Sequence, residues 1–225
     1  LLGDRLLSAA KLLLVNKIRC IPVVEKDTEG VLALVTNDSI VKFLQKQIRS
    51  LPLPAWMRLP VRAVQVGTWD GLITVTQASK LSDAIDLLIK KKLSFLPVVR
   101  PLSRDESLNE PPEFVCCLTK GAIFGLLAQL SMGSDGKEQK LAYERLHALS
   151  VGEALDQWEA VACRSNYATP ATCGASDNLT TVADIMATKN TRWVCALDDG
   201  LLLGIISCSD VLEYMIRKRG EGPDE

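Results

Sequence analysis

The sequence predicts an α/β fold made of small repeated units with the order helix, strand, strand, helix. An apolar segment with helical spacing recurs, and its first two copies begin 75 residues apart, at Leu6 and Leu81. Each copy leads into a short apolar strand, followed by a second strand that ends in Thr or Ser. Such internal repetition is typical of repeat architectures. The two strands of a unit can share one small sheet, with both helices on one face.

The first helix of each unit is predicted from apolar residues that recur every three or four positions. These helices span residues 6–13, 81–88 and 179–186. The first strands follow at residues 21–24, 96–99 and 193–197. The third copy is the weakest, because one residue is missing between its helix and its strand.

The second strand of each unit meets the second helix at a hydroxyl residue. The strands are predicted at residues 33–36, 116–119 and 204–207, and the helices at 40–44, 123–127 and 211–215. Thr36, Thr119 and Ser207 stand at the junctions, where a side-chain oxygen can accept a hydrogen bond from a free backbone N–H of the helix.

The segments between and after the units are predicted to be irregular. Residues 50–54 contain two prolines and should form an extended connector. Residues 102–112 and 131–140 are mostly polar and should form surface loops. The tail from Gly220 to Glu225 should be disordered.

Composition excludes several classes of function. Apolar residues make up 48% of the 225 and charged residues 24%, which is typical of a globular protein and not of a disordered one. The net charge of −1 predicts no broad cationic surface for nucleic acid or membranes. No apolar run approaches the roughly 18 residues of a membrane span. The seven cysteines form no Cys-x-x-Cys pair and His147 is the only histidine, so we expect a reduced protein without a metal site.

Four segments resemble, in the same order, the gamma subunits of AMP-activated/SNF1-type protein kinases, which are built from cystathionine-β-synthase (CBS) domains. Residues 16–24 resemble a helix-to-strand junction of that family's second repeat. Residues 51–57 with 64–69 resemble its linker into the third repeat. Residues 149–155 resemble the start of the fourth repeat, and residues 204–210 resemble its nucleotide motif.

The resemblance implies tandem CBS domains in an N-terminally truncated fragment. The chain also begins without Met, as expected of a piece of a longer protein. Residues 1–50 would be part of the second repeat, 56–132 the third, 145–218 the fourth, and 219–225 a disordered tail.

The start of the last predicted helix has the groups that a nucleoside monophosphate needs. Asp210 lies one helical turn after Ser207, and a carboxylate can accept hydrogen bonds from two adjacent ribose hydroxyls. Ser207 and Ser209 lie at the helix N-terminus, which favours a phosphate. The resemblance implies these same roles, and it adds Thr68, Gly71 and Ile73, which would hold the nucleoside. A plain helix cap is the alternative interpretation of Ser207 and Asp210.

Cations from the other units should meet the phosphate charge. Arg19, Ser94 and Arg192 occupy the same repeat position and should face one centre. The resemblance places Arg19 where the family has a phosphate-facing histidine, and it matches Lys92 and Arg164 to family arginines. Solvated surface positions are the alternative for Arg19 and Arg192.

The other two units lack the carboxylate of Asp210. Ser39 and Ala122 stand at the equivalent positions, and alanine cannot hold ribose hydroxyls. Asp38 replaces a basic family residue and should repel phosphate. We therefore expect one good site, in the last unit, and a degenerate or empty second site.

The resemblance implies a regulatory subunit that binds AMP, ADP or ATP and assembles with a kinase alpha subunit and a beta scaffold. No catalytic residues, nucleic acid or membrane are expected, and the location should be cytoplasmic, with the nucleus as an alternative. Three other functions remain open. They are a CBS-domain regulator of a metabolic enzyme, a scaffold that has lost nucleotide binding, and an enzyme in its own right.

Overall fold

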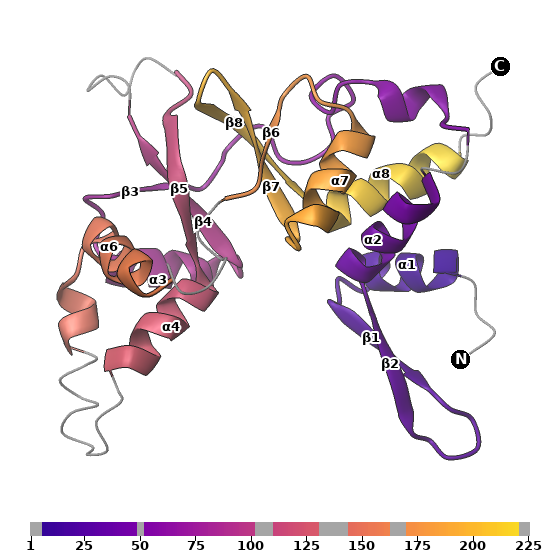
Figure 1. The fold of residues 1–225 in the computed structure, drawn as a ribbon, viewed down its shortest axis with the longest axis horizontal. Helices are drawn as coiled ribbons and strands as arrows, with labels where there is room; N and C mark the ends of the chain where they lie inside the picture. The colour runs from indigo at the N-terminus through magenta and orange to yellow at the C-terminus, as the bar shows by residue number, and fades with distance from the viewer. Residues whose placement is uncertain (1–5, 49–51, 102–109, 131–143, 163–169, 221–225) are drawn as a thin grey trace. The chain divides into compact units, whose positions relative to one another are not determined.

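The computed structural model describes residues 6–48, 52–101, 110–130, 144–162 and 170–220 (Figure 1). They form two compact units. Unit 1 contains the chain up to Gly71, Ala171–Asp198 and the segment from Leu203 onward. Unit 2 contains Leu72–Pro170 and Asp199–Leu202. The candidate site lies in unit 1.

The N-terminal part of unit 1 is one helix–strand–strand–helix motif. Its elements are α1 (Leu6–Val15), β1 (Cys20–Val24), β2 (Val31–Thr36) and α2 (Asn37–Ile48). β1 and β2 pair as an antiparallel hairpin, with Cys20 opposite Thr36. α2 therefore starts beside the turn that leads into β1.

The rest of unit 1 repeats this motif and adds a short parallel strand. Its elements are the 3₁₀ helix η1 (Ala55–Arg58), β6 (Thr172–Gly174), α7 (Leu179–Thr188), β7 (Trp193–Asp198), β8 (Leu201–Ser207) and α8 (Cys208–Gly220). β6 runs parallel to β7, and β8 adjoins β7 on its other side. α8 reaches Gly220, so residues 219 and 220, predicted as part of a disordered tail, are helical. The remaining tail lies outside the described residues.

Unit 2 holds the remaining copy of the motif. Its elements are β3 (Val75–Thr76), α3 (Leu81–Lys90), β4 (Phe95–Arg100), β5 (Glu113–Thr119), α4 (Lys120–Leu130) and α6 (Val151–Ala162). β3 runs parallel to β4, and β4 runs antiparallel to β5. The predicted α/β fold of helix–strand–strand–helix repeats is confirmed.

A left-handed residue follows the first helix of every motif. Lys17, Lys92 and Asn190 have φ angles of 51°, 54° and 52°. They occupy the same repeat position, two residues before Arg19, Ser94 and Arg192 respectively. This turn redirects the chain from the helix into the strand, so the residue two positions on lies at the start of the strand in all three copies.

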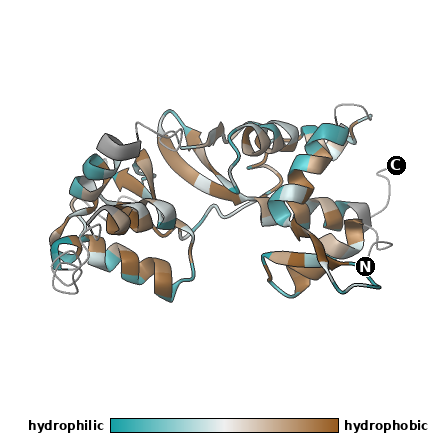
Figure 2. Ribbon diagram, turned by 60° about the horizontal axis from the view of Figure 1, so that its bottom comes forward, coloured by the Kyte–Doolittle hydropathy of each residue, from teal (hydrophilic) through white to brown (hydrophobic). Residues whose placement is uncertain are grey.

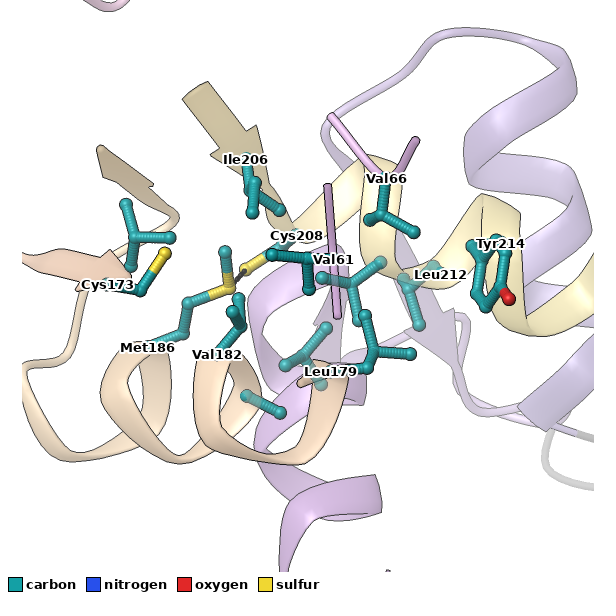
Figure 3. Close-up of a cluster of buried hydrophobic side chains, with 14 of the residues drawn as sticks. Val61, Val66, Cys173, Leu179, Val182, Met186, Ile206, Cys208, Leu212 and Tyr214 are labelled. Carbon is teal, nitrogen blue, oxygen red and sulfur yellow. Dashed lines mark hydrogen bonds between the residues drawn. The ribbon is translucent and has the colours of Figure 1, made fainter. Parts of the chain in front are cut away.

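The core of unit 1 lies between the helices and the sheet (Figure 3). Leu179, Val182 and Met186 project from one face of α7, at the spacing of successive helical turns. They pack with Ile206 and with Cys208 at the start of α8. Each of these side chains is almost fully buried, which contributes about 1.5–3 kcal/mol for a Leu, Ile or Val.

The packing crosses the predicted repeat boundaries at two places. η1 and the linker up to Gly71, assigned above to the third repeat, belong to unit 1, where η1 contacts α7. α6, assigned above to the fourth repeat, packs on α3 and α4 in unit 2, because Val151 and Ala154 are buried there. Figure 2 shows hydrophobic residues along the strands and at intervals along the helices, and hydrophilic residues in several turns. Among the described helices, none has the length and apolarity to cross a membrane.

Candidate functional site

The turn from β8 to α8 positions the carboxylate of Asp210. Its Oδ2 accepts hydrogen bonds from the backbone N–H and the hydroxyl of Ser207, both at 2.7 Å. The Ser207 hydroxyl oxygen in turn accepts from the N–H of Asp210 at 3.3 Å. This is a reciprocal helix cap, so the alternative interpretation as a cap holds. Within the described part of the chain, Oδ1 of Asp210 has no hydrogen-bond partner, and a cap leaves it available for a ligand.

The same turn occurs in each motif with a different residue in the Asp210 position. At the start of α2, Ser39 Oγ accepts from the N–H of Thr36 at 2.9 Å. At the start of α4, Ala122 donates its backbone N–H to Thr119 Oγ1 at 3.1 Å. Only Asp210 brings a carboxylate to this point of the three turns.

The segment before Gly71 runs beside β8. Thr68 donates its N–H to the Ile205 carbonyl at 2.8 Å and accepts the Ile205 N–H at 2.9 Å. Trp69 lies flat against Gly204, where an added Cβ would meet its ring at 2.6 Å. This pairing fixes Thr68 beside Ile205, which lies two residues before Ser207 on β8. Gly71 is exposed, with a φ of 63°, and ends this segment of unit 1.

Arg192, in the turn before β7, lies beside the start of α8, and its side chain pairs with a carboxylate. Its backbone carbonyl accepts the N–H of Cys208 at 2.9 Å. Its Nε lies 3.5 Å from Oδ1 of Asp38, whose Oδ2 lies 3.5 Å from Lys42 Nζ. Lys42 also donates to Asn190 Oδ1 at 2.5 Å. The expected phosphate-facing cation is therefore paired within the protein.

Asn37 connects this ion-pair cluster to Ser209. Its Nδ2 donates to Ser209 Oγ at 2.8 Å, so the first turns of α2 and α8 meet. Oδ1 of Asn37 is buried and has no hydrogen-bond partner among the described residues. Arg19 is exposed and forms no ion pair within the described part of the chain.

The cluster lowers the pKa of Asp38. Burial alone raises the pKa of this carboxyl, but the Thr36 hydroxyl, Arg192 and Lys42 together bring it below its ordinary 3.8. The charged form is thus favoured in the folded state. Its contribution to stability is present above pH 3.8 and is lost as the pH falls through the lower folded-state pKa.

Three predicted site residues lie in unit 2. Ile73 packs against the core that contains Val75 and Leu81. Lys92 is the exposed left-handed residue after α3, and the Ser94 carbonyl accepts the N–H of Lys120 at 3.2 Å. Arg164 lies outside the described residues. The structure brings together Thr68, Ser207, Asp210, Ser209 and Arg192, all in unit 1, and the assignment of the site residues remains a prediction.

Sequence reasoning missed Asn37, Lys42 and Asn190. Asp38 and Lys42 are four residues apart on a helix, which is a signal for a local ion pair. Asn at the left-handed position after α7 was a further signal, because Asn tolerates this conformation. The contact between Asn37 and Ser209 depends on how α2 packs on α8, and no local pattern indicates it.

Cys208 should be unreactive although it lies at the site. Its thiol is buried 3.6 Å from Met186 Sδ, and burial, then the charge of Asp38, raises its pKa to about 12. Cys173 is also buried, with its pKa raised to about 12. We expect iodoacetamide at pH 8 to modify exposed Cys20 rapidly, and Cys208 and Cys173 only after denaturation. Mass spectrometry of peptides would measure the three rates, and equal rates would contradict the packing.

The sequence and fold match known proteins over most of the chain. The CBS domain family matches residues 166–217. The human 5'-AMP-activated protein kinase subunit gamma-3 is 27% identical over 215 residues, which are 95% of this chain and 39% of the relative. The gamma subunit of Dictyostelium discoideum is 28% identical, over 94% of this chain and 33% of the relative. The chain thus spans between a third and two fifths of the length of these curated relatives.

Solved structures support the fold. A Methanocaldococcus jannaschii protein, described as a candidate archaeal homologue of the kinase gamma subunit, superposes with a TM-score of 0.66 at 20% identity, covering 95% of this chain and 65% of that one. A conserved protein of Pyrococcus horikoshii gives 0.61 at 17% identity, over 94% and 75%. The chain is therefore a homologue of the gamma subunits of 5'-AMP-activated protein kinase and has the fold of CBS domains.

Proposed function

We propose that the chain is the adenine-nucleotide-binding regulatory part of a Ser/Thr protein kinase assembly. The observation that carries the proposal is the turn at the start of α8, where Asp210 caps the helix through one oxygen and Thr68 is held nearby by its backbone pairing with Ile205 of β8. The names of the gamma-subunit homologues, which describe an AMP-activated kinase, support an adenine nucleotide as the ligand.

In this proposal Asp210 Oδ1 accepts hydrogen bonds from the ribose hydroxyls of AMP, ADP or ATP. Ser207 and Ser209 contribute hydroxyls at the helix N-terminus, where the dipole favours the phosphate. Thr68 and Gly71 border the nucleoside, and Arg19 approaches from the strand turn of the first motif. Ile73, Ser94 and Lys92 belong to unit 2 and Arg164 lies outside the described residues, so their part in the site remains a prediction from the repeats and the family resemblance.

Catalysis is assigned to a kinase alpha subunit, held with this chain by a beta scaffold. The nucleotide would regulate that kinase only if it binds the active and inactive assemblies with different affinities. The proposed location is cytoplasmic, with the nucleus as an alternative. Affinity purification of the chain from its own cells should recover both partner subunits. Recovery of a metabolic enzyme in their place would favour the other class of CBS regulator.

Calorimetric titration of AMP into the wild type and Asp210→Asn tests the nucleotide site. Asn keeps an oxygen that can accept the cap bonds of Ser207, but it presents an amide where the ribose needs an acceptor. We expect an affinity loss of at least about tenfold, the value of a hydrogen bond to a charged group.

Asp177→Asn is the matched control. Asp177 is a half-buried carboxylate in the turn before α7 of the same unit, where it accepts the Gly174 N–H at 2.8 Å, and it is not part of the proposed site. Its variant should bind AMP like the wild type. Equal affinities for all three proteins would place the nucleotide elsewhere. The absence of AMP binding by the wild type would favour the alternative function, a CBS-domain scaffold that has lost nucleotide binding. The ion pair of Arg192 with Asp38 also fits that function.

A further inference from the structure

The Asp38 carboxylate is shared between two cations from different parts of unit 1. Lys42 belongs to its own helix, one turn further along, and Arg192 belongs to the turn before β7. Only 21% of the Asp38 side chain is exposed, against 68% for Arg192. The anion is therefore the more protected member, and solvent screens it less than an ordinary surface charge.

Packing of α2 on α7 holds Asp38 in this place. Asp38 and Lys42 lie along one side of α2, and Gln45 follows one turn later, donating from its buried side chain to Asp184 on α7. Lys42 donates to Asn190, just beyond the end of α7. Successive turns of α2 are thus joined to one neighbouring segment, so Asp38 does not depend on a flexible loop for its position.

The cluster borders the start of α8. Asn37, the neighbour of Asp38, donates to Ser209, and the carbonyl of Arg192 accepts from Cys208. The Cys208 thiol lies close enough to Asp38, Lys42, Arg192 and Asp210 for each charge to influence it. An anion bound at Ser207 and Ser209 would lie near Asp38 and Arg192. The Asp38 charge would then offset part of the attraction between the anion and Arg192.

We propose that Asp38 determines specificity by pairing with Arg192 and Lys42, so that the site gains less affinity from each added phosphate than the two cations alone would give. This inference rests on the proposed nucleotide site. One carboxylate against two cations leaves the cluster with a net charge of +1 in place of +2. Asp38 therefore lowers the attraction for ATP more than for ADP, and for ADP more than for AMP. Removal of the Asp38 charge should shift the preference toward the more highly charged nucleotides.

The test is calorimetric titration of adenosine, AMP, ADP and ATP into the wild type, Asp38→Asn and Asp184→Asn. Asp184→Asn is matched, because Asp184 also accepts a hydrogen bond in the packing of α2 on α7, at the Gln45 amide, and the change removes one negative charge there. In Asp38→Asn we expect affinity gains of about threefold for AMP rising to about tenfold or more for ATP at low salt, with adenosine unchanged. Asp184→Asn should show no such gradient.

Arg192→Gln in the Asp38→Asn background tests the contribution of the cationic partner of Asp38. It should remove most of the ATP gain, because the released guanidinium is then absent. A gain of equal size for adenosine and ATP, or equal behaviour of Asp38→Asn and Asp184→Asn, would overturn the inference and leave the proposed function standing.

Inorganic pyrophosphate separates the two proposals. If neither adenosine nor any nucleotide binds any variant, the proposed function fails, and pyrophosphate still reports on the cations. Tighter pyrophosphate binding by Asp38→Asn than by Asp184→Asn would then support the release of Arg192 and Lys42. Equal binding by the two variants would refute it.

Discussion

Replacement of Gly67 by alanine should lower the free energy of unfolding by about 4 kcal/mol, from backbone strain and overpacking together. Gly67 has a φ of 104°, which side-chain-bearing residues rarely adopt. An added Cβ would lie 2.5 Å from the carbonyl oxygen of Ile205 and 2.8 Å from Ile206 Cγ1. The first of these atoms is backbone, so relief requires β8 or the Gly67 segment to move.

The movement would also reach the candidate site. Thr68, the next residue, pairs through both backbone groups with Ile205, so separation of the two segments breaks these hydrogen bonds. We therefore expect Gly67→Ala to lose AMP binding along with stability. Urea unfolding followed by far-UV circular dichroism measures the first effect, and calorimetry measures the second.

Gly71→Ala provides the matched control for Gly67→Ala. Gly71 also has a positive φ, 63°, but no atom lies within 4 Å of its added Cβ. Only the backbone cost of about 1–2 kcal/mol applies there. Similar losses of unfolding free energy in the two variants would show that the close approach of Gly67 to Ile205 does not determine the stability of this segment.

The repeated fold could be predicted because its signals are local. The hydroxyl residues Thr36, Thr119 and Ser207 do begin the capping turns of α2, α4 and α8. Each of these capping turns depends only on residues within one helical turn, and the reciprocal hydrogen bonds between Ser207 and Asp210 are part of one of them. β3 and β6, with two and three residues, were not predicted, because strands so short carry no periodic pattern.

Burial depended on partners that local sequence does not show. β2 and β8 are equally apolar, yet Leu34 on β2 is 61% exposed while Ile206 on β8 is buried. In the described residues β2 pairs only with β1, whereas within unit 1 β8 lies beside β7 on one side and pairs with Thr68 through Ile205. The packing of α6 in unit 2 could not be predicted for the same reason. The sequence of α6 does not show that its apolar face covers α3 and α4.

The charge at the site was predicted in part. Sequence identified Asp38 as unfavourable for phosphate and Arg192 as favourable, and both remain predictions. Their ion pair could not be foreseen, because the two residues are distant in sequence and meet only when α2 packs on α7 and α8. The equivalent positions in the repeats predicted that Arg192 faces the candidate site. They did not indicate which side chain would pair with its guanidinium.

Replacement of Gly125 by alanine should destabilise unit 2 by about 3 kcal/mol, the upper end of the range for overpacking. Gly125 lies in α4, and the indole ring of Trp158 on α6 packs directly against its backbone. An added Cβ would overlap the Trp158 ring atoms Cζ3, Cη2 and Cε3, so the ring or the whole of α6 must move. Urea unfolding of the variant measures the loss.

Gly121→Ala in the same helix should have the opposite sign. Its added Cβ would lie 3.7 Å from Thr119 Oγ1, an ordinary contact, so the better helix propensity of alanine should stabilise the protein by about 0.5 kcal/mol. A second change, Trp158→Leu, should recover much of the Gly125→Ala loss, because leucine cannot reach as far across the α4 backbone. If both glycine variants were stabilising, helix propensity would outweigh the Trp158 contact. The joining of α4 to α6 would then rest on Val151 and Ala154 instead of the indole ring.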